Sequence, residues 1–283
     1  MPIRLLPPAT ADRIAAGEVV ERPAAVVKEL VENALDAGAR RIRVAIEGGG
    51  AQRILVEDDG IGMGAEDLAL CVERHATSKL AEEAMLFSIG TLGFRGEALP
   101  SIGAVARLAI TSRPRDGEAH RIAVEAGRKG PVLPAAGPPG TRVEVTDLFF
   151  ATPARRKFLR SAAREGEAAI EALRRLAIAW PEVGFEATLE GRPALKLEPA
   201  TPEARIRDLL GPGFAAACVA VEAPGAITVR GLAGGPAWGR PTMADQHLVV
   251  NRRPVKDPVL RAALRVAYRE VMAPGRHPAC ALF

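Results

Sequence analysis

The sequence has 283 residues, a net charge of +4, and 48% hydrophobic and 25% charged residues. This length favours two domains, and this composition excludes a wholly disordered chain. No apolar run is long enough to span a membrane, and Met1-Pro-Ile-Arg4 does not begin a signal peptide. The three cysteines are scattered without metal-ligand spacing, so we expect reduced core thiols in a cytoplasmic protein.

Two helices are expected at the start of the chain. The first covers residues 10–20, and the second covers 23–37 because a proline begins it and a glycine follows it. On the second helix, Glu29, Asn33 and Asp36 share one face and apolar residues occupy the other. An ordinary amphipathic helix with a solvated face explains this pattern. However, an acid and an amide one turn apart are also what a metal–nucleotide site needs.

A hairpin and a glycine-rich turn are predicted next. Residues 41–47 and 52–57 alternate as strands do, and three glycines form the turn between them. The second strand runs into Asp58-Asp59-Gly60-Ile61-Gly62-Met63-Gly64. Its glycines indicate backbone that a ligand approaches closely, or a plain turn that needs positive φ. The spacing differs from that of a dinucleotide-binding fingerprint.

A long irregular stretch separates this turn from a second glycine-rich segment. A helix is predicted over residues 65–74, and residues 79–89 have the weak periodicity of a movable excursion. The excursion ends at the segment Gly90–Leu99, where glycine-rich backbone leads into a helix. Such backbone binds anions because unpaired N–H groups point outward, and a flexible surface loop is the alternative.

The remainder of the chain alternates strands and helices. We predict strands over 107–112, 120–125, 141–146, 183–189, 194–198, 216–221, 227–232, 247–251 and 279–283. We predict helices after the loop at 148–158, over 165–179, 201–210 and 258–271. A domain boundary near Pro199–Pro202 gives domains 1–200 and 201–283. The last strand–helix–strand order predicts a crossover to a parallel partner, and a chain that stops in mid-strand suggests a piece of a longer protein.

Together these signals resemble the ATP-binding fold shared by DNA gyrase, Hsp90 chaperones, sensor histidine kinases and MutL. The resemblance to the MutL family of DNA mismatch-repair proteins is much the closer one, and it is dense up to Leu159. It is carried by Ile14-Ala-Ala-Gly-Glu-Val-Val-Glu-Arg-Pro23, Lys28-Glu-Leu-Val-Glu-Asn33, Leu35-Asp-Ala-Gly38, Arg74-His-Ala-Thr-Ser-Lys79, Leu92-Gly-Phe-Arg-Gly-Glu-Ala-Leu99 and Ala151-Thr-Pro-Ala-Arg-Arg-Lys-Phe-Leu159. The implied fold class is α+β. It combines a Bergerat-type (GHKL) α/β sandwich ATPase domain with a ribosomal-S5-like α/β domain that is truncated at its C-terminus.

The resemblance implies roles for the positions that match the family's motifs, with ATP and Mg²⁺ as cofactors. Glu29 would be the general base that orients and deprotonates the attacking water. Asn33 would contact the nucleotide and supply an oxygen ligand to Mg²⁺. Asp58 would accept a hydrogen bond from the adenine amino group, Gly62 would let the turn pass close to the base, and Thr141 would lie near the adenine.

The lid of the nucleotide site would be residues 74–96. Further nucleotide-binding residues implied by the motifs are Thr77, Ser78, Lys79, Gly93, Phe94, Arg95, Gly96, Glu97, Ala98 and Leu99. Two departures from the family pattern matter. The family's lysine that reaches the γ-phosphate would lie beyond Phe283, and Ala151 stands where relatives often carry Asn.

The implied function is a DNA mismatch-repair ATPase with slow, Mg²⁺-dependent turnover, weakly active in this fragment. ATP would close the lid, order residues 1–22 and pair two copies around DNA. Expected partners are double- and single-stranded DNA bound without sequence preference, a mismatch-recognition protein and other repair factors, but no membrane. Candidate contacts to DNA phosphates are Arg252, Arg253, Arg155 and Arg156, although a solvated helix face also explains the last two. The alternatives are a nucleotide-gated scaffold without turnover, or an Hsp90- or gyrase-like ATPase with another partner.

Overall fold

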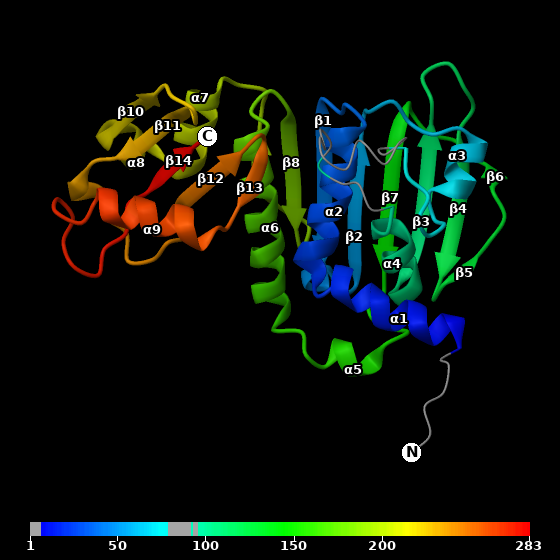
Figure 1. Ribbon diagram of the computed structural model, residues 1–283. Helices are drawn as coiled ribbons and strands as arrows, with labels where there is room; N and C mark the ends of the chain where they lie inside the picture. Colours follow the sequence, from blue (N-terminus) through cyan, green and yellow to red (C-terminus); the bar gives the residue numbers. More distant parts are fainter. Residues whose placement is uncertain (1–6, 79–91, 93–95) are drawn as a thin grey trace. The chain divides into compact units, whose positions relative to one another are not determined.

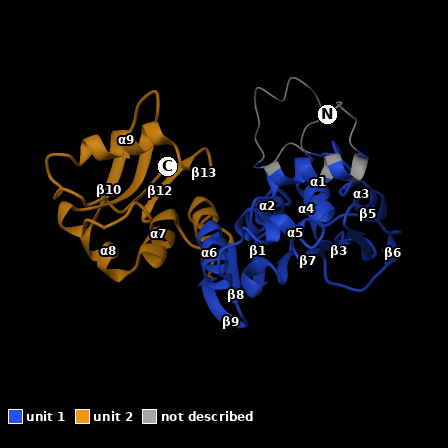
Figure 2. Ribbon diagram, turned by 90° about the horizontal axis from the view of Figure 1, so that it is seen from below, with its two compact units in different colours: residues 1–173, 184–196 blue, residues 174–183, 197–283 orange. Residues whose placement is uncertain are grey.

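The computed structural model describes residues 7–78, 92 and 96–283 (Figure 1). Contacts divide the chain into two compact units, residues 1–173 with 184–196 (unit 1) and residues 174–183 with 197–283 (unit 2), as coloured in Figure 2. The long helix α6 (Ala162–Ala179) contributes to both units. The single boundary near residue 200 stays a prediction.

Unit 1 is built on a sheet that has nine strands within the described residues. The strands are β1 (Arg41–Glu47), β2 (Arg53–Asp58), β3 (Arg107–Arg113), β4 (His120–Glu125), β5 (Arg128–Lys129), β6 (Leu133–Pro134), β7 (Gly140–Thr146), β8 (Gly184–Leu189) and β9 (Arg192–Leu197). Their order is β5-β4-β3-β7-β2-β1-β8-β9, and β6 pairs with β4. Strand β1 pairs antiparallel with β2 and parallel with β8. The predicted hairpin and most predicted strands are therefore confirmed.

Alternating side chains give this sheet two different faces. On β1, Ile42, Val44 and Ile46 are buried, whereas Arg41 and Arg43 are exposed. Helices cover the buried face, as Figures 1 and 2 both show. The helices of unit 1 besides α6 are α1 (Pro8–Val19), α2 (Pro23–Asp36), α3 (Ala65–Leu70), α4 (Ala98–Val105) and α5 (Pro153–Arg156).

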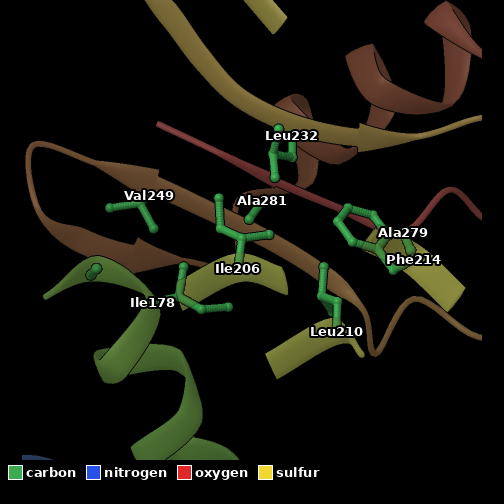
Figure 3. Close-up of a cluster of buried hydrophobic side chains, with 9 residues drawn as sticks. Ile178, Ile206, Leu210, Phe214, Leu232, Val249, Ala279 and Ala281 are labelled. Atoms are coloured by element: carbon green, nitrogen blue, oxygen red, sulfur yellow. The ribbon is translucent and has the colours of Figure 1, made fainter. Parts of the chain in front are cut away.

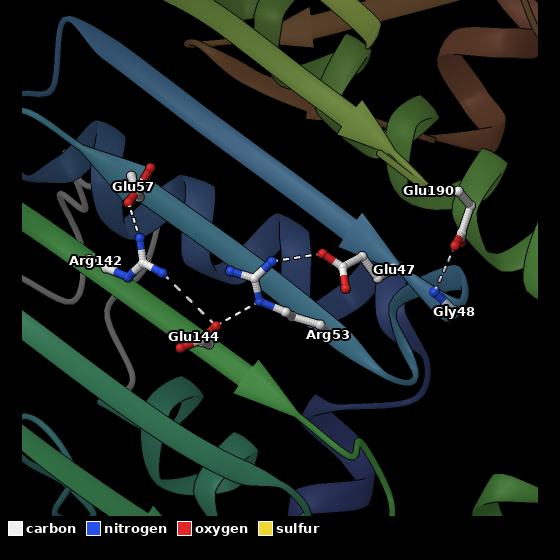
Figure 4. A network of polar contacts seen from close by, with 7 residues as sticks. All are labelled: Glu47, Gly48, Arg53, Glu57, Arg142, Glu144 and Glu190. Atoms are coloured by element: carbon white, nitrogen blue, oxygen red, sulfur yellow. Dashed lines mark hydrogen bonds and ion pairs between the residues drawn. The ribbon is translucent and has the colours of Figure 1, made fainter. Parts of the chain in front are cut away.

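The opposite face of the sheet carries ion pairs between neighbouring strands (Figure 4). Arg53 Nη1 lies 2.7 Å from Glu47 Oε1, and its Nε lies 2.6 Å from Glu144 Oε1. Arg142 pairs in the same way with Glu57. Cross-strand pairs in contact with solvent contribute roughly 0.2–1 kcal/mol each, so this face is a solvated surface rather than a second core.

The three glycines between β1 and β2 form a short 3₁₀ turn, η1 (Gly48–Gly50). All three have positive φ, which glycine adopts without strain. The carboxylate of Glu190 accepts a hydrogen bond from the Gly48 N–H at 3.1 Å (Figure 4) and another from the Gly49 N–H at 2.9 Å. This glycine run therefore holds one of the protein's own carboxylates.

Unit 2 has a five-stranded sheet within the described residues, in the order β10-β11-β14-β12-β13. Its elements are α7 (Pro202–Leu210), α8 (Pro212–Ala217), β10 (Cys218–Ala223), β11 (Val229–Gly234), η3 (Pro236–Trp238), β12 (Gln246–Val250), β13 (Arg253–Val255), α9 (Pro258–Ala267) and β14 (Cys280–Leu282). Strands β12 and β14 pair in parallel, as the predicted crossover requires. Figure 3 shows a core cluster in which Ile178, Ile206, Phe214, Leu232 and Val249 pack together.

Several predicted elements of the chain are wrong at their ends. The predicted strand 216–221 begins only at Cys218, because Pro212 starts a short helix that buries Phe214 in the core. The predicted helix 258–271 ends at Ala267, and the helix predicted over 65–74 ends at Leu70. Strand β13 was not predicted because it is short and lies at the sheet edge, where a proline is tolerated.

An arginine is completely buried in unit 2. Arg205 of α7 has 0% exposure, and its guanidinium donates to the carbonyl oxygens of Ala177 at 2.8 Å, Pro181 at 2.9 Å, Val183 at 2.9 Å and Glu198 at 2.7 Å. Burial lowers the pKa of this guanidinium. Arg205 therefore ties α7 to the chain that leaves α6.

Candidate functional site

The catalytic candidates lie on α2, in the helical layer of unit 1. The side chain of Glu29 is 28% exposed, and its Oε1 lies 3.1 Å from Lys28 Nζ. Lys28 also donates to Oε2 of the buried Glu32 at 2.7 Å. Burial raises the pKa of Glu32. Burial alone would lower the pKa of Lys28, but the carboxylates of Glu29 and Glu32 outweigh this effect, so the pKa of Lys28 is raised. Glu29 is therefore an accessible carboxylate steadied by a neighbouring ammonium group, and Asn33 lies one turn further along the same helix.

A network of hydroxyl groups joins the end of β2 to β7. Asp58 is in register with Thr141, and Asp58 Oδ1 accepts from the Gly60 N–H at 2.9 Å. Thr141 Oγ1 lies 2.9 Å from Ser112 Oγ, which accepts from the Met63 N–H at 2.8 Å. Burial raises the pKa of Asp58 to about 6. Sequence reasoning missed the buried Ser112, because a single serine in a strand gives no pattern.

The turn after β2 is shaped by backbone packing. Gly62 has φ +70°, and a Cβ there would lie 2.1 Å from the carbonyl oxygen of Arg113. Asp59 accepts from the N–H groups of Arg40 at 2.7 Å and Arg41 at 2.8 Å, so it fixes the start of β1. The positive φ and the close packing explain why residue 62 is a glycine. The predicted approach of this turn to the adenine base stays a prediction.

The two ends of the predicted lid lie together. Glu97 Oε1 is 2.9 Å from His75 Nδ1, and its Oε2 is 3.9 Å from Arg74 Nη1. Gly96 has φ +61°, and a Cβ there would lie 2.5 Å from the carbonyl oxygen of Ala76. The motif implied that Glu97 contacts the nucleotide. In the structure, Glu97 lies at one end of the predicted lid and contacts His75 and Arg74 at the other end.

Asp36 makes a contact that the sequence did not suggest. Its Oδ1 accepts a hydrogen bond from the Leu92 N–H at 2.9 Å, so the last turn of α2 contacts Leu92 of the predicted lid. Of the other motif residues, Thr77 and Ser78 lie in the first part of the predicted lid, and Ala98 and Leu99 begin α4. The predicted contacts that lie outside the described residues are Lys79, Gly93, Phe94 and Arg95.

The basic residues predicted to contact DNA lie in different surroundings. In unit 2, the guanidinium of Arg252 stacks 3.8 Å from the centroid of the Trp180 ring and pairs with Glu182, while Arg253 begins β13. In unit 1, Arg156 is exposed. Arg155 is half-buried there, and it donates to the carbonyl oxygen of Val20 at 3.4 Å. Arg155 and Arg252 therefore already have partners within the protein.

The donor groups of unit 1 fit a magnesium–nucleotide complex. The amide oxygen of Asn33 suits Mg²⁺, which takes few protein oxygens and shares phosphate oxygens and waters. The N-terminus of α4 has no side-chain cap, so its N–H groups suit a phosphate. The Asp58 carboxylate suits the amino group of a purine.

Comparisons with known proteins agree with this arrangement. Residues 21–126 match the family described as histidine kinase-, DNA gyrase B- and HSP90-like ATPase, and residues 206–283 match the C-terminal domain of DNA mismatch repair protein. The solved structure of the Aquifex aeolicus MutL ATPase domain complexed with ADP is 31% identical, with a TM-score of 0.70, and the alignment covers 93% of this chain and 92% of that one. The chain belongs to the MutL family.

Curated MutL proteins are more similar still. DNA mismatch repair protein MutL of Acidiphilium cryptum is 55% identical over all of this chain, which covers 49% of that protein. The Nitrobacter winogradskyi MutL is 54% identical, with 48% of its length covered. The chain therefore spans about half the length of the curated MutL relatives it matches.

Membership of the MutL family settles the architecture. Unit 1 has the ATPase fold that the sequence predicts, unit 2 contains the whole mismatch-repair domain match, and the mixed α and β fold class is confirmed. Within the described residues, no helix has the length and apolar character needed to cross a bilayer.

The half-buried carboxylate of Asp58 gives a testable pH dependence. Because its pKa is raised to about 6, the folded ligand-free chain holds this proton more strongly than the unfolded chain. The free energy of unfolding should therefore fall as the pH rises from about 4 to about 6, and stay lower above that. Asp58→Asn removes this charge and should stabilise the chain by on the order of 1–2 kcal/mol at about pH 8, but much less at about pH 4.

Thermal melts of both proteins across this pH range measure the effect. The matched control is Asp116→Asn, which changes an exposed aspartate in a turn of the same unit and should show no such trend. A stability difference for Asp58→Asn that does not vary with pH would contradict the assignment.

Proposed function

We propose that this chain is the ATP-hydrolysing part of a DNA mismatch-repair protein of the cytoplasm, and that Mg²⁺ is required for turnover. The observation that carries the proposal is that three suitable groups lie on neighbouring elements of unit 1, because α2 packs against both β2 and α4. These groups are the Glu29 carboxylate on α2, the Asp58 acceptor at the end of β2, and the uncapped N-terminus of α4. The Aquifex aeolicus MutL ATPase domain with ADP supports nucleotide binding by this arrangement.

In the proposed reaction, each group of the chain has a separate task. Glu29 orients a water molecule and accepts its proton as the oxygen attacks the γ-phosphorus of ATP, and the bond to the β–γ bridging oxygen breaks. Lys28 fixes the Glu29 carboxylate by the 3.1 Å contact. Asn33 would hold Mg²⁺, which supplies charge neutralisation on the phosphates when bound. The charged carboxylate of Asp58 accepts a hydrogen bond from the adenine amino group, and guanine cannot donate this hydrogen bond.

Movement of the lid would couple turnover to partners. Glu97 contacts His75 and Asp36 accepts a hydrogen bond from Leu92, so a nucleotide that displaces the lid would alter these contacts with α2 and α4. We infer that ATP-dependent pairing of two copies encloses DNA, and that a mismatch-recognition protein and other repair factors engage this closed form.

Measurement of phosphate release from ATP tests the proposal. Turnover that requires Mg²⁺ and stops with EDTA is the expected result. ATP binding without any turnover would favour the alternative, a nucleotide-gated scaffold. Absence of ATP binding by calorimetry would overturn the proposal itself.

Contact with DNA phosphates should depend on Arg253. We expect Arg253→Glu to weaken binding to a DNA duplex, and to reduce the slope of log affinity against log salt by roughly one. Arg253 is changed alone because substitution of the neighbouring Arg252 would also remove its contacts with Trp180 and Glu182. Filter-binding titrations over a range of salt concentrations measure both quantities.

The control for this experiment is Arg192→Glu, which makes the same charge change at an exposed position of β9 in unit 1. If affinity and salt slope are the same for Arg253→Glu and Arg192→Glu, Arg253 does not contact DNA. A change in affinity alone, with the slope intact, would also contradict a phosphate contact.

A further inference from the structure

Two motifs that the proposed chemistry leaves without a role meet in unit 1. One is the segment around Gly17 in α1, and the other is the loop with the short helix α5, which contains Arg155. Figure 1 shows α5 beside the C-terminal part of α1, and a hydrogen bond joins them. The two segments are far apart in the sequence, so this contact comes from the fold alone.

The guanidinium of Arg155 occupies the space that a side chain at Gly17 would need. A Cβ built on Gly17 would lie 1.4 Å from Nη2 and 1.9 Å from Cζ of Arg155. A glycine inside a helix costs roughly 0.5–1 kcal/mol relative to alanine, so its presence needs a packing reason. The packing reason is that the guanidinium of Arg155 lies in the space that a side chain at residue 17 would fill.

The same guanidinium also serves the C-terminal end of α1. Arg155 Nη1 donates to the carbonyl oxygen of Val20, at the C-cap of the helix. A cation is favourable there because the last carbonyl groups of a helix carry partial negative charge. The last turn of α1 has no basic residue of its own, and Arg155 brings one from α5.

This contact lies next to the catalytic helix. Val20 is fully buried, and only residues 20–22 separate α1 from α2, which begins at Pro23 and carries Glu29. A shift of the end of α1 is therefore transmitted through a short, packed connection to the start of α2.

We propose that Arg155 is a positioning residue for ATP hydrolysis. By filling the space at Gly17 and binding the Val20 carbonyl, it holds the end of α1 and thereby the register of α2, on which Glu29 lies. The inference rests on the proposed ATPase function. It gives Arg155 a role inside unit 1 that is separate from the DNA contact predicted for it.

A double-mutant cycle tests the contact. Gly17→Ala favours the helix itself but displaces the guanidinium, which is the flexible end of a long side chain. We expect Gly17→Ala and Arg155→Ala each to lower kcat about five- to tenfold, with KM for ATP within about twofold of wild type. Gly17→Ala should have no further effect in the Arg155→Ala background, because its target is then gone. Arg155→Lys should restore part of kcat, and the control Arg160→Ala, an exposed arginine of the same loop, should leave kcat unchanged.

Hydrogen exchange of the amides of residues 9–20 provides a readout that does not need catalysis. Exchange should be faster in both single variants than in wild type, and no faster in the double variant than in Arg155→Ala. Equal exchange in all four proteins would overturn the contact. Equal effects of Gly17→Ala on kcat in both backgrounds would overturn it as well. A wild-type chain without ATP turnover would instead overturn the proposed function, and the exchange cycle would then decide on the contact alone.

Discussion

Glu29→Ala should reduce kcat for ATP hydrolysis by about a hundredfold or more, while the Kd for ATP stays within about threefold of wild type. The physical reason is that the carboxylate accepts a proton only as water attacks, so its removal raises the barrier without removing contacts to the bound nucleotide. Steady-state phosphate release gives kcat, and calorimetry on the same preparations gives Kd.

Two further variants test whether the loss of activity comes from the loss of the proton acceptor. Glu29→Gln keeps the size of the side chain and its hydrogen-bonding capacity, but cannot accept the proton, so it should be nearly as slow as Glu29→Ala. Glu66→Ala removes an exposed glutamate from α3 and should hydrolyse ATP at the wild-type rate. Near-normal turnover by Glu29→Gln would show that Glu29 is not the base.

Arg205→Met should destabilise unit 2 by about 3 kcal/mol. Methionine fills a similar volume, but it leaves the carbonyl oxygens of Ala177, Pro181, Val183 and Glu198 without their donor. Loss of the buried charge offsets part of this cost, since burial lowers the pKa of the guanidinium.

The position of the tryptophans makes this experiment selective. Both tryptophans of the chain, Trp180 and Trp238, lie in unit 2, so a urea titration followed by tryptophan fluorescence reports on that unit. Arg207→Met, on the same helix but exposed, is the matched control and should change the midpoint little. Equal midpoints for the two variants would show that the hydrogen bonds from Arg205 to the carbonyl oxygens contribute nothing to the stability of unit 2.

The sequence predicts those parts of the fold that follow from local patterns. Residues 41–47 were predicted as a strand with the observed bounds, because apolar residues at alternate positions bury one face. The parallel pairing of β12 and β14 followed from the order of elements. In contrast, residues 216–217 were predicted as strand and are helical, because the burial of Phe214 depends on distant residues that no local window contains.

The candidate site shows the same division. Glu29 and Asn33 share a helix, so periodicity alone places them on one face. Ser112, which bridges Met63 and Thr141, comes from another strand and shows no sequence signal. The roles of all these residues in ATP chemistry rest on family resemblance, and they stay predictions until the variants are measured.

The contact between Glu97 and His75 has a consequence for how this region can be engineered and how it can diverge. Because these two residues lie side by side, the connection between them starts and ends at one place on unit 1. Doubling the length of such a loop costs only about 0.6 kcal/mol in closure entropy. Lids of different length, or a reporter peptide inserted between the flanks, can therefore be exchanged at this point while the sheet and helices of unit 1 keep their packing.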